Sequence, residues 1–367
     1  MFSEHKVYIE INSIPLRSLT SSSDFRYTLI DVLQLFLRKA NCTPISPPKV
    51  TLKPETFLNS IKAHLNIYQA SMPRQFATDL PADVKQTTLK DEPKDWYIKT
   101  ADFGDTHDRP LQHRSGEYTQ LLEDLSVYHQ ILQDHCDRVI VLRPHNYSGY
   151  DVLINAAMRC LGYSAAQFQF IVVQPLQLYA FHQSDQKLHQ IPDLPADELI
   201  KAVGMDALRW HSLATPLNKF APINISTAGQ ATPQDPLYRV QAAHARCCQF
   251  LQGAHQQQVI KLRVSDDSPW QIDSASTATP ELTDENVIAV RKQLLQKDTW
   301  LANAANEIAP HYICQYLSNL SEHCHSYLNK TAPSDSICHL LLETKNTIWE
   351  LLKLLEISAP TPADLPC

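Results

Sequence analysis

Residues 204–220, GMDALRWHSLATPLNKF, and residues 234–251, QDPLYRVQAAHARCCQFL, decide the fold of this chain. Four residues of the second stretch share one side of a helix, because they follow the spacing i, i+3, i+4, i+7: Tyr238, Gln241, Ala242 and Ala245. In the first stretch, Asp206 stands where a helix begins, and a carboxylate suits the positive end of the helix dipole. The two stretches therefore predict helices over about 196–214 and 235–257.

The pattern outside these stretches predicts a mixed chain. Downstream, apolar stripes at helical spacing predict three more helices, over 283–306, 309–330 and 334–356. Upstream, strands are expected at 6–11, 137–144 and 168–181, and helices at 54–68, 72–80, 117–136 and 155–163. Strand, helix and strand from 137 to 181 have the spacing of a βαβ crossover. The expected fold class is α+β, with helix dominant.

Four segments follow from this pattern. We expect an N-terminal α+β module over 1–80, a polar linker over 81–116, a βαβ region over 117–203 and a helical bundle over 204–367.

Composition limits the function classes. The net charge of −7 argues against a strongly basic nucleic-acid binder, although a local basic patch is compatible with it. The chain has only seven glycines among its 367 residues. This is roughly 2%, far below the average glycine content of about 7%. Glycine-rich turns are where nucleotide-binding domains let backbone approach phosphate, so a working nucleotide cradle is not expected. Nine scattered cysteines without a CxxC pair and no apolar N-terminal segment predict a cytoplasmic protein with reduced thiols and no membrane span.

Several motifs resemble the arginyl-tRNA synthetases. Asp206-Ala207-Leu208-Arg209 and the run from Tyr238 to Arg246 resemble the start of that family's DALR anticodon-binding domain. ELLKLLEISAP at 350–360 resembles its closing helix and L-G-I-x-x-P tail. Tyr118-Thr119, Asp137-Arg138-Val139-Ile140 and His145…Gly149-Tyr150 resemble the later half of its catalytic domain. Residues 66–80 faintly resemble the end of its tRNA-elbow-binding extension. The resemblance implies a reduced class I, Rossmann-like βαβ remnant joined to an all-α anticodon-binding bundle.

Two departures bear on catalysis. Class I synthetases carry an H-hydrophobic-G-H turn and a K-M-S-K-like loop, which stabilise the triphosphate and the departing pyrophosphate. The 367 residues contain no H-hydrophobic-G-H tetrapeptide. At the place of the second signature stand residues 184–190, SDQKLHQ, with the single lysine Lys187. His145, Gly149, Tyr150 and Lys187 are therefore expected to be degenerate remnants of a nucleotide site, with no catalytic residue and no cofactor.

The resemblance implies an RNA-contacting helix, since the family uses this helix at the anticodon, where unstacked bases meet aromatic rings and arginine planes. The candidate tRNA-binding residues are Tyr238, Arg239, Gln241, His244, Arg246 and Arg209. Three of them have a structural alternative: Tyr238 and His244 are also typical packing residues, and Arg209 is also suited to a local ion pair. Residues 204–367 hold 12 Lys and Arg against 16 Asp and Glu, so RNA affinity requires clustered arginines.

A metal site is not expected. His323, Cys324 and His325 are adjacent on a predicted helix, so their side chains point in different directions and cannot all bind one ion.

Three functions remain. The leading hypothesis is a non-catalytic relative of arginyl-tRNA synthetase that binds arginine tRNA, with no DNA partner, and serves as an adaptor for another enzyme, such as a tRNA-modifying enzyme. The alternative is a protein-interaction scaffold that has lost RNA binding. The third is a residual arginine-tRNA ligase.

Overall fold

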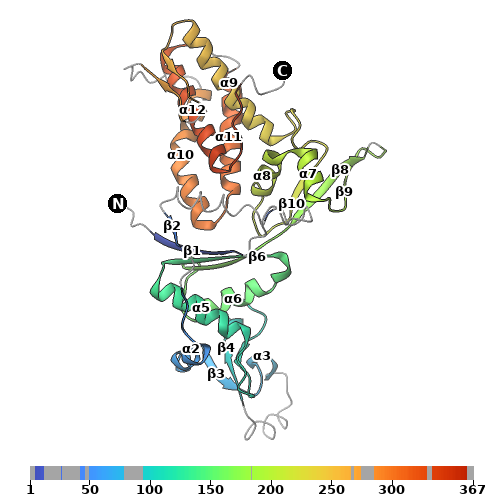
Figure 1. Ribbon diagram of the computed structural model, residues 1–367, viewed down its shortest axis with the longest axis vertical. Coiled ribbons are helices and arrows are strands. Elements are labelled where there is room, and N and C mark those ends of the chain that lie inside the picture. The colour runs from blue at the N-terminus through green and yellow to red at the C-terminus, as the bar shows by residue number, and fades with distance from the viewer. Residues whose placement is uncertain are drawn as a thin grey trace. The chain divides into compact units, whose positions relative to one another are not determined.

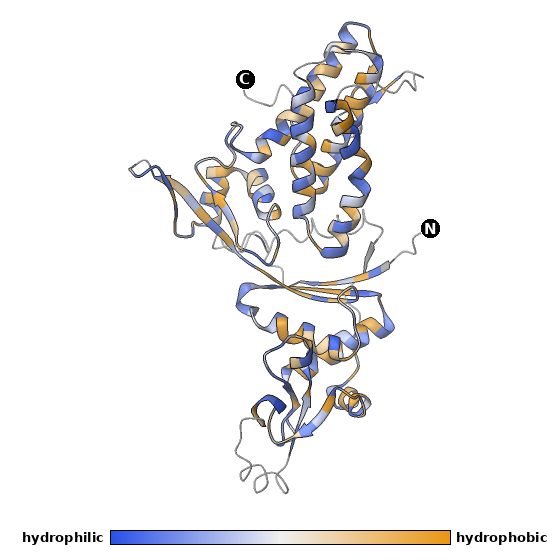
Figure 2. Ribbon diagram, turned by 180° about the vertical axis from the view of Figure 1, so that it is seen from behind, coloured by the Kyte–Doolittle hydropathy of each residue, from blue (hydrophilic) through white to orange (hydrophobic). Residues whose placement is uncertain are grey.

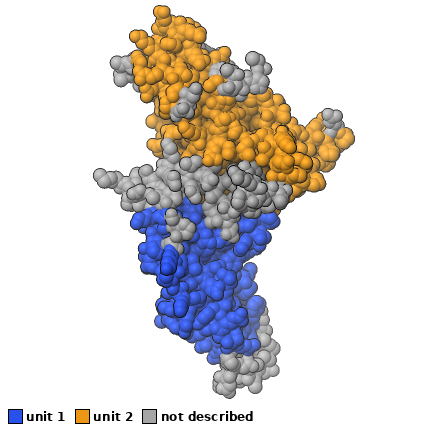
Figure 3. Space-filling view, viewed as in Figure 1, with its two compact units in different colours: residues 1–12, 41–173 blue, residues 13–40, 174–367 orange. Residues whose placement is uncertain are grey.

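The computed structural model describes residues 5–11, 26, 42–45, 49–77, 94–182, 184–265, 268–273, 285–328 and 333–361. The chain divides into two compact units (Figure 3). Unit 1 comprises Met1–Asn12 and Asn41–Val173, and unit 2 comprises Ser13–Ala40 and Gln174–Cys367. The fold is α+β and most of its regular structure is helical, as the sequence predicts.

A four-stranded parallel sheet forms one layer of unit 1 (Figure 1). Its order is β2 (Cys42–Ile45), β1 (His5–Ile11), β6 (Arg138–Pro144) and β7 (Phe168–Val173). Helix α6 (Tyr150–Cys160) connects β6 to β7, which are parallel, so the predicted βαβ unit is confirmed. The short 3₁₀ turn η4 (His145–Tyr147) follows β6. Strand β1 is where the sequence predicts a strand, but it pairs with β6 rather than forming a separate N-terminal module.

An antiparallel sheet lies between β2 and α5 (Gln120–Asp134) along the chain. It follows helix α2 (Pro54–Ile61) and has the order β3 (Ile67–Ala70), β4 (Asp95–Ile98), β5 (Arg109–Gln112). The short helix α3 (Arg74–Ala77) follows β3 along the chain, and the 3₁₀ helix η3 (Thr100–Phe103) follows β4. The helix predicted over 54–68 is thus too long, because Tyr68 belongs to β3. The helix predicted over 72–80 begins at Arg74, and residues 78–80 lie outside the described part.

The linker predicted over 81–116 is wrong for residues 94–116, and residues 78–93 lie outside the described part. The segment is polar because its strands have only four residues and because Asp108, a completely buried carboxylate, lies within it. Asp108 accepts hydrogen bonds from Arg74, Tyr68 and Gln75. Its charge is therefore compensated inside the fold, which local composition does not reveal.

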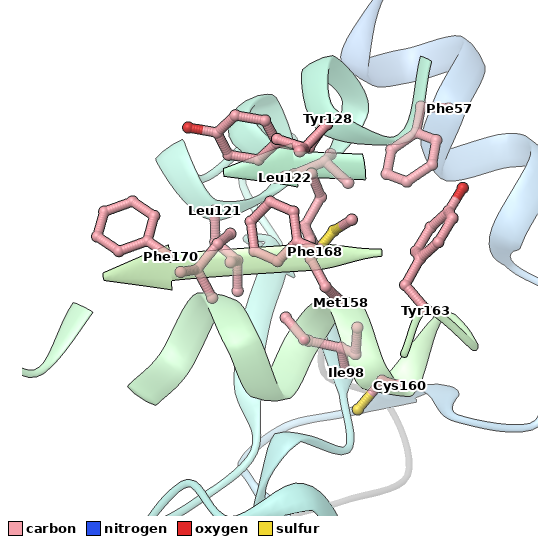
Figure 4. Close-up of a cluster of buried hydrophobic side chains, with 14 of the residues drawn as sticks. Phe57, Ile98, Leu121, Leu122, Tyr128, Met158, Cys160, Tyr163, Phe168 and Phe170 are labelled. Carbon is pink, nitrogen blue, oxygen red and sulfur yellow. The ribbon is translucent and has the colours of Figure 1, made fainter. Parts of the chain in front are cut away.

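One hydrophobic core joins both sheets of unit 1 (Figure 4). Phe57 of α2, Ile98 of β4, Leu122 of α5, Met158 of α6 and Phe168 of β7 all belong to it. Burying each such side chain contributes roughly 1.5–3 kcal/mol. Residues 49–77 and 94–173 therefore share one core, and the predicted boundaries at 80 and 116 do not separate independent cores.

The predicted strand over 168–181 is two strands. β7 ends at Val173, and β8 (Leu176–His182) begins after Gln174-Pro175 and pairs in a different sheet. Proline has no backbone N–H to donate to a ladder, which favours the break. The boundary between the units thus falls at 173/174, whereas the sequence places a boundary at 203/204.

Unit 2 begins with a three-stranded sheet of order β10 (Ala221–Asn224), β8, β9 (Lys187–Gln190). The helix predicted over 196–214 is divided into α7 (Ala196–Val203) and α8 (Met205–Leu213) at Gly204, whose φ of 81° ends α7. The other predicted helices of this part are confirmed as α9 (Pro236–Gln256), α10 (Glu285–Glu307), α11 (His311–Leu328) and α12 (Asp335–Leu354).

These four long helices pack on one another, α10 against α11 and α9 against both α11 and α12. Figure 2 shows blue and orange residues alternating along them, as expected for amphipathic helices. A two-stranded ribbon, β11 (Leu262–Arg263) with β12 (Gln271–Ile272), follows α9. Within the described ranges, every helix is too short or too polar to cross a bilayer.

Candidate nucleic-acid interface

Helix α9 carries most of the candidate residues, and its first turn is tightly fixed. Asp235 caps it by accepting from the backbone N–H of Leu237 at 3.0 Å, and the same carboxylate accepts from Gly229 N–H at 2.9 Å. Gly229 has φ of 72°, and a side chain there would collide with the backbone of Val203. The buried side of α9 then runs through Val240, Ala243 and Cys247 to the bundle core.

The opposite edge of α9 presents two arginines one above the other. Arg239 is exposed and Arg246 is half-buried, seven residues further along the same face. Ala242 lies between them, and Tyr238 is half-buried beside Arg239. This edge is the only described place where the sequence-predicted candidates remain accessible as a group.

His325 of α11 links the two arginines. Arg246 Nη1 lies 2.8 Å from His325 Nδ1, and His325 Nε2 lies 2.9 Å from the carbonyl oxygen of Arg239. Arginine keeps its protons at any ordinary pH, so Nδ1 accepts and Nε2–H donates, which defines one neutral tautomer. Burial lowers the pKa of His325, and the charges of Arg246 and Arg239 act in the same direction.

Asp206 and Arg209 hold the segment that follows α12. Arg209 Nη1 donates to the carbonyl of Glu356 at 2.6 Å, and its Nη2 lies 3.3 Å from the Glu356 carboxylate. Asp206 accepts from the backbone N–H of Ser358 at 3.1 Å and from its hydroxyl group. The structure therefore gives Arg209 an ion pair, but with a residue 147 positions later rather than the local partner that the sequence suggested.

Gln241 and His244 contact the same segment. Gln241 Nε2 donates to the carbonyl of Ser358 at 3.0 Å, and His244 Nδ1 donates to the carbonyl of Pro360 at 3.0 Å. His244 is only 2% exposed, and burial lowers its pKa to about 4. Both side chains thus hold residues 356–361, and of the six candidates only Tyr238, Arg239 and Arg246 lie on the edge beside α11.

Local sequence reasoning missed the role of His325 and of residues 356–361. One signal was present: the family tail L-G-I-x-x-P reads Leu355-Glu356-Ile357 here. Glu356 has φ of 55°, the left-handed conformation that glycine adopts most readily. A glutamate in place of the family's glycine suggests that the side chain at this position makes an interaction, and in the structure Glu356 forms the ion pair with Arg209.

The residues predicted as nucleotide-site remnants belong to two different units. In unit 1, His145 is exposed in η4, Gly149 begins α6 with φ of 94°, and Tyr150 donates to Asp124 at 2.5 Å. The ring of Tyr150 also packs edge-on against Phe170. In unit 2, Lys187 is exposed on β9 opposite His182. Tyr150 thus has a packing role, and Lys187 stands on a hairpin near the carboxylate of Asp185.

Cys324 and His325, which are adjacent on α11, point to different surroundings, as helical geometry requires. Cys324 is completely buried with its Sγ 3.3 Å from Sγ of Cys247, whereas His325 uses both ring nitrogens on α9. Throughout the described ranges, no three His, Cys, Asp or Glu side chains lie close enough together to hold a metal ion.

Comparison with known proteins agrees with this architecture. Residues 240–362 match the model of the DALR anticodon binding domain. The arginine–tRNA ligase of Ureaplasma parvum is 30% identical over 263 residues, which are 71% of this chain and 44% of the relative. That of Oceanobacillus iheyensis is 26% identical over 273 residues, 72% of this chain and 47% of the relative. The chain thus spans about half the length of the curated relatives it matches.

Solved structures share the fold. Thermus thermophilus arginyl-tRNA synthetase superposes with a TM-score of 0.61 at 14% identity, covering 97% of this chain and 82% of that one. The Plasmodium falciparum arginyl-tRNA synthetase gives 0.57 at 11% identity, covering 98% and 77%. The chain is therefore arginyl-tRNA synthetase-like, with a DALR anticodon binding domain in its C-terminal helices.

Proposed function

We propose that this chain binds arginine tRNA through the α9 edge formed by Tyr238, Arg239, Ala242 and Arg246, and that it does not form an aminoacyl-adenylate. The observation that carries the proposal is the Arg239–His325–Arg246 cluster: Arg246 and His325 lie within residues 240–362, which match an anticodon binding domain, and Arg239 directly precedes that range. Two guanidinium groups beside a partly exposed tyrosine are the chemistry with which proteins meet unstacked RNA bases and phosphates.

The charge balance explains why this edge matters. Residues 204–367 carry more acidic than basic side chains, so their overall field does not attract RNA. Binding must then depend on a local cluster, and the α9 edge supplies one at a place where the small side chain of Ala242 leaves room for a base. The curated relatives of this chain are named arginine–tRNA ligases, which favours arginine tRNA as the RNA.

The lack of catalysis is supported by the two departures in sequence. Without an H-hydrophobic-G-H turn, and with Lys187 as the single lysine of residues 184–190, little positive charge is available for a departing pyrophosphate. Tyr150, a further expected remnant, is engaged by Asp124. The proposed function requires no cofactor, and we place the protein in the cytoplasm as part of the same proposal.

Filter binding at fixed salt tests the RNA part. The wild-type chain is expected to prefer arginine tRNA over a tRNA of another identity, and Arg239→Ala and Arg246→Ala should each weaken binding about tenfold. Arg263→Ala is the matched control, because Arg263 is an exposed arginine of the same unit that pairs with Asp273 on the β11–β12 ribbon. Equal affinity for both tRNAs, or equal losses in all three variants, would overturn the proposal.

Arginine-dependent exchange of pyrophosphate into ATP tests the catalytic part. We expect no exchange above the rate without arginine, with and without arginine tRNA. An arginine-dependent rate would establish the residual ligase instead.

A protein-interaction scaffold is the second candidate, and one observation favours it. The β8–β9 hairpin places Phe181 and Leu188 directly opposite each other, 43% and 52% exposed. Because they are directly opposite on neighbouring strands, the two side chains form one small apolar patch, and contiguous apolar patches mark contact sites for other proteins. Absence of tRNA binding at low salt would favour the scaffold. If the double variant Phe181→Ser/Leu188→Ser binds tRNA as the wild type does, the hairpin is not needed for RNA and is available to a protein partner, as in an adaptor.

A further inference from the structure

We infer that the two arginines of the α9 edge have different roles in RNA recognition: His325 fixes Arg246 so that it selects the RNA, while Arg239 supplies electrostatic attraction without selection. The inference rests on the proposed tRNA binding and assigns His325 as a positioning residue.

His325 is held firmly in place. The residue before it, Cys324, and the residue after Arg246, Cys247, are both completely buried and bring their sulfur atoms within 3.3 Å of each other. This contact fixes α9 and α11 at the level of the Arg246–His325 hydrogen bond. The second bond of His325, to the carbonyl of Arg239, fixes the orientation of the ring. The acceptor that Arg246 uses is therefore rigid.

A rigid acceptor orients the guanidinium plane. Arginine presents planar donors, and its selectivity for a base or a bent backbone depends on where that plane points. Arg246 begins its RNA contact with the plane already restrained by His325, so less conformational entropy is lost when the correct RNA binds. The residue that is ordered in advance is the one that can discriminate between RNAs.

Arg239 is arranged differently. Its backbone carbonyl is engaged by His325, but its side chain is exposed and makes no hydrogen bond or ion pair with any residue in the described ranges. A mobile cation of this kind attracts phosphate wherever phosphate lies. Such contacts add affinity and salt dependence but carry no sequence information.

Salt titrations of binding test this division. The affinities of arginine tRNA, and of the same tRNA with its anticodon loop replaced, are measured over a range of salt concentrations. Arg239→Ala should reduce the slope of log K against log salt by about 0.7–0.9 for both RNAs and leave their ratio unchanged. Arg246→Lys keeps the charge but removes the planar donors, so it should keep the slope and lower the ratio about tenfold.

Two substitutions of His325 separate its two bonds. His325→Asn places an amide oxygen near the position of Nδ1 and retains an acceptor for Arg246, so most of the discrimination should remain. His325→Gln places its amide near the position of Nε2 and retains the donor to Arg239, so discrimination should fall about as far as in Arg246→Lys. A merely structural role of His325 would make the two variants alike in discrimination.

The outcomes are distinguishable. A wild-type chain that does not bind tRNA contradicts the proposed function itself. A wild-type chain that binds and discriminates, with His325→Gln equal to His325→Asn or with Arg239→Ala as harmful to discrimination as Arg246→Lys, overturns the division of roles alone. Where a His325 variant does not fold, Arg246→Lys and Arg239→Ala still decide, since they leave α11 unchanged.

Discussion

Arg209 donates a 2.6 Å hydrogen bond to the backbone carbonyl of Glu356, a residue 147 positions later that adopts the left-handed conformation. The chain ends α12 there with two characteristic bonds, from Glu356 N–H to the carbonyl of Lys353 and from Ile357 N–H to that of Leu352. The arginine of the DALR motif thus stabilises a helix end that lacks the usual glycine.

Replacing Glu356 by glycine should reveal the strain of this helix end. In an Arg209→Ala background, Glu356→Gly is expected to stabilise unit 2 by about 1 kcal/mol, because glycine adopts positive φ without steric conflict. In the wild-type background the gain should be smaller, since the half-exposed ion pair, worth about 0–1 kcal/mol, is lost. Urea unfolding gives both values.

The control for that substitution is Glu322→Gly, at an exposed position inside α11. Glycine there should destabilise by about 1 kcal/mol, because it increases the freedom of the unfolded chain. If Glu356→Gly lowers the free energy of unfolding as much as Glu322→Gly does, the backbone at Glu356 is not strained.

Acid should weaken unit 2 through His244. Its pKa falls from 6.5 to about 4 on folding, mainly because it is buried, so the unfolded chain binds a proton that the folded chain does not. Stability is therefore full above about pH 6.5 and declines as the pH falls toward 4, by at most about 3 kcal/mol. Urea unfolding at several pH values should show this decline in the wild type and a smaller one in His244→Gln.

Gln249→Ala replaces an exposed, uncharged residue of the same helix, so it serves as the control and should keep the wild-type dependence on pH. If His244→Gln and the wild type lose the same stability between pH 6.5 and 4, His244 is not buried in its neutral form.

Asp108 should be essential for the antiparallel sheet of unit 1. Its carboxylate is completely buried and accepts from Arg74 Nε at 2.6 Å, from Tyr68 and from Gln75. Burial alone would raise its pKa, but these hydrogen bonds outweigh burial and lower it. Asp108→Asn leaves Arg74 and Tyr68 with a poorer partner, at a cost of about 2–3 kcal/mol.

Hydrogen exchange of peptides covering β4 and β5 measures that loss locally. Asp102→Asn is the matched control, because Asp102 pairs with the same arginine but is half-exposed, and its loss should cost under about 1 kcal/mol. Equal acceleration of exchange in both variants would show that burial of Asp108 does not set its importance.

The thiols of the folded chain should be unreactive. All seven cysteines whose side chains are described are buried, and burial raises the pKa of Cys160 to about 12 and that of Cys248 to about 11. With Cys42 and Cys367 replaced by serine, a thiol-reactive disulfide reagent should label the chain only as it unfolds. Labelling of even one thiol within seconds, under conditions where the chain is folded, would contradict this burial.

The sequence by itself determined the elements whose side-chain pattern is regular. The apolar stripes of α9, α10, α11 and α12 are long enough for helical periodicity to specify them, and the continuous apolar run of β6 specified a buried parallel strand. The motif around Arg246 likewise indicated the class of domain from local residues alone, since residues 240–362 match a DALR anticodon binding domain.

Only the tertiary structure decided the partners of polar side chains and the boundary between the units. The composition of residues 94–116 is that of a linker, and only the folded chain shows that Asp108 within it binds Arg74. The single apolar run from 168 to 181 likewise contributes strands to two different sheets. Gln241 and His244 bind a segment more than a hundred residues away, while Arg246 meets His325. Periodicity records which side of an element is apolar, but a hydrogen bond depends on which distant atoms the folded backbone brings within about 3 Å, and no local pattern encodes that distance.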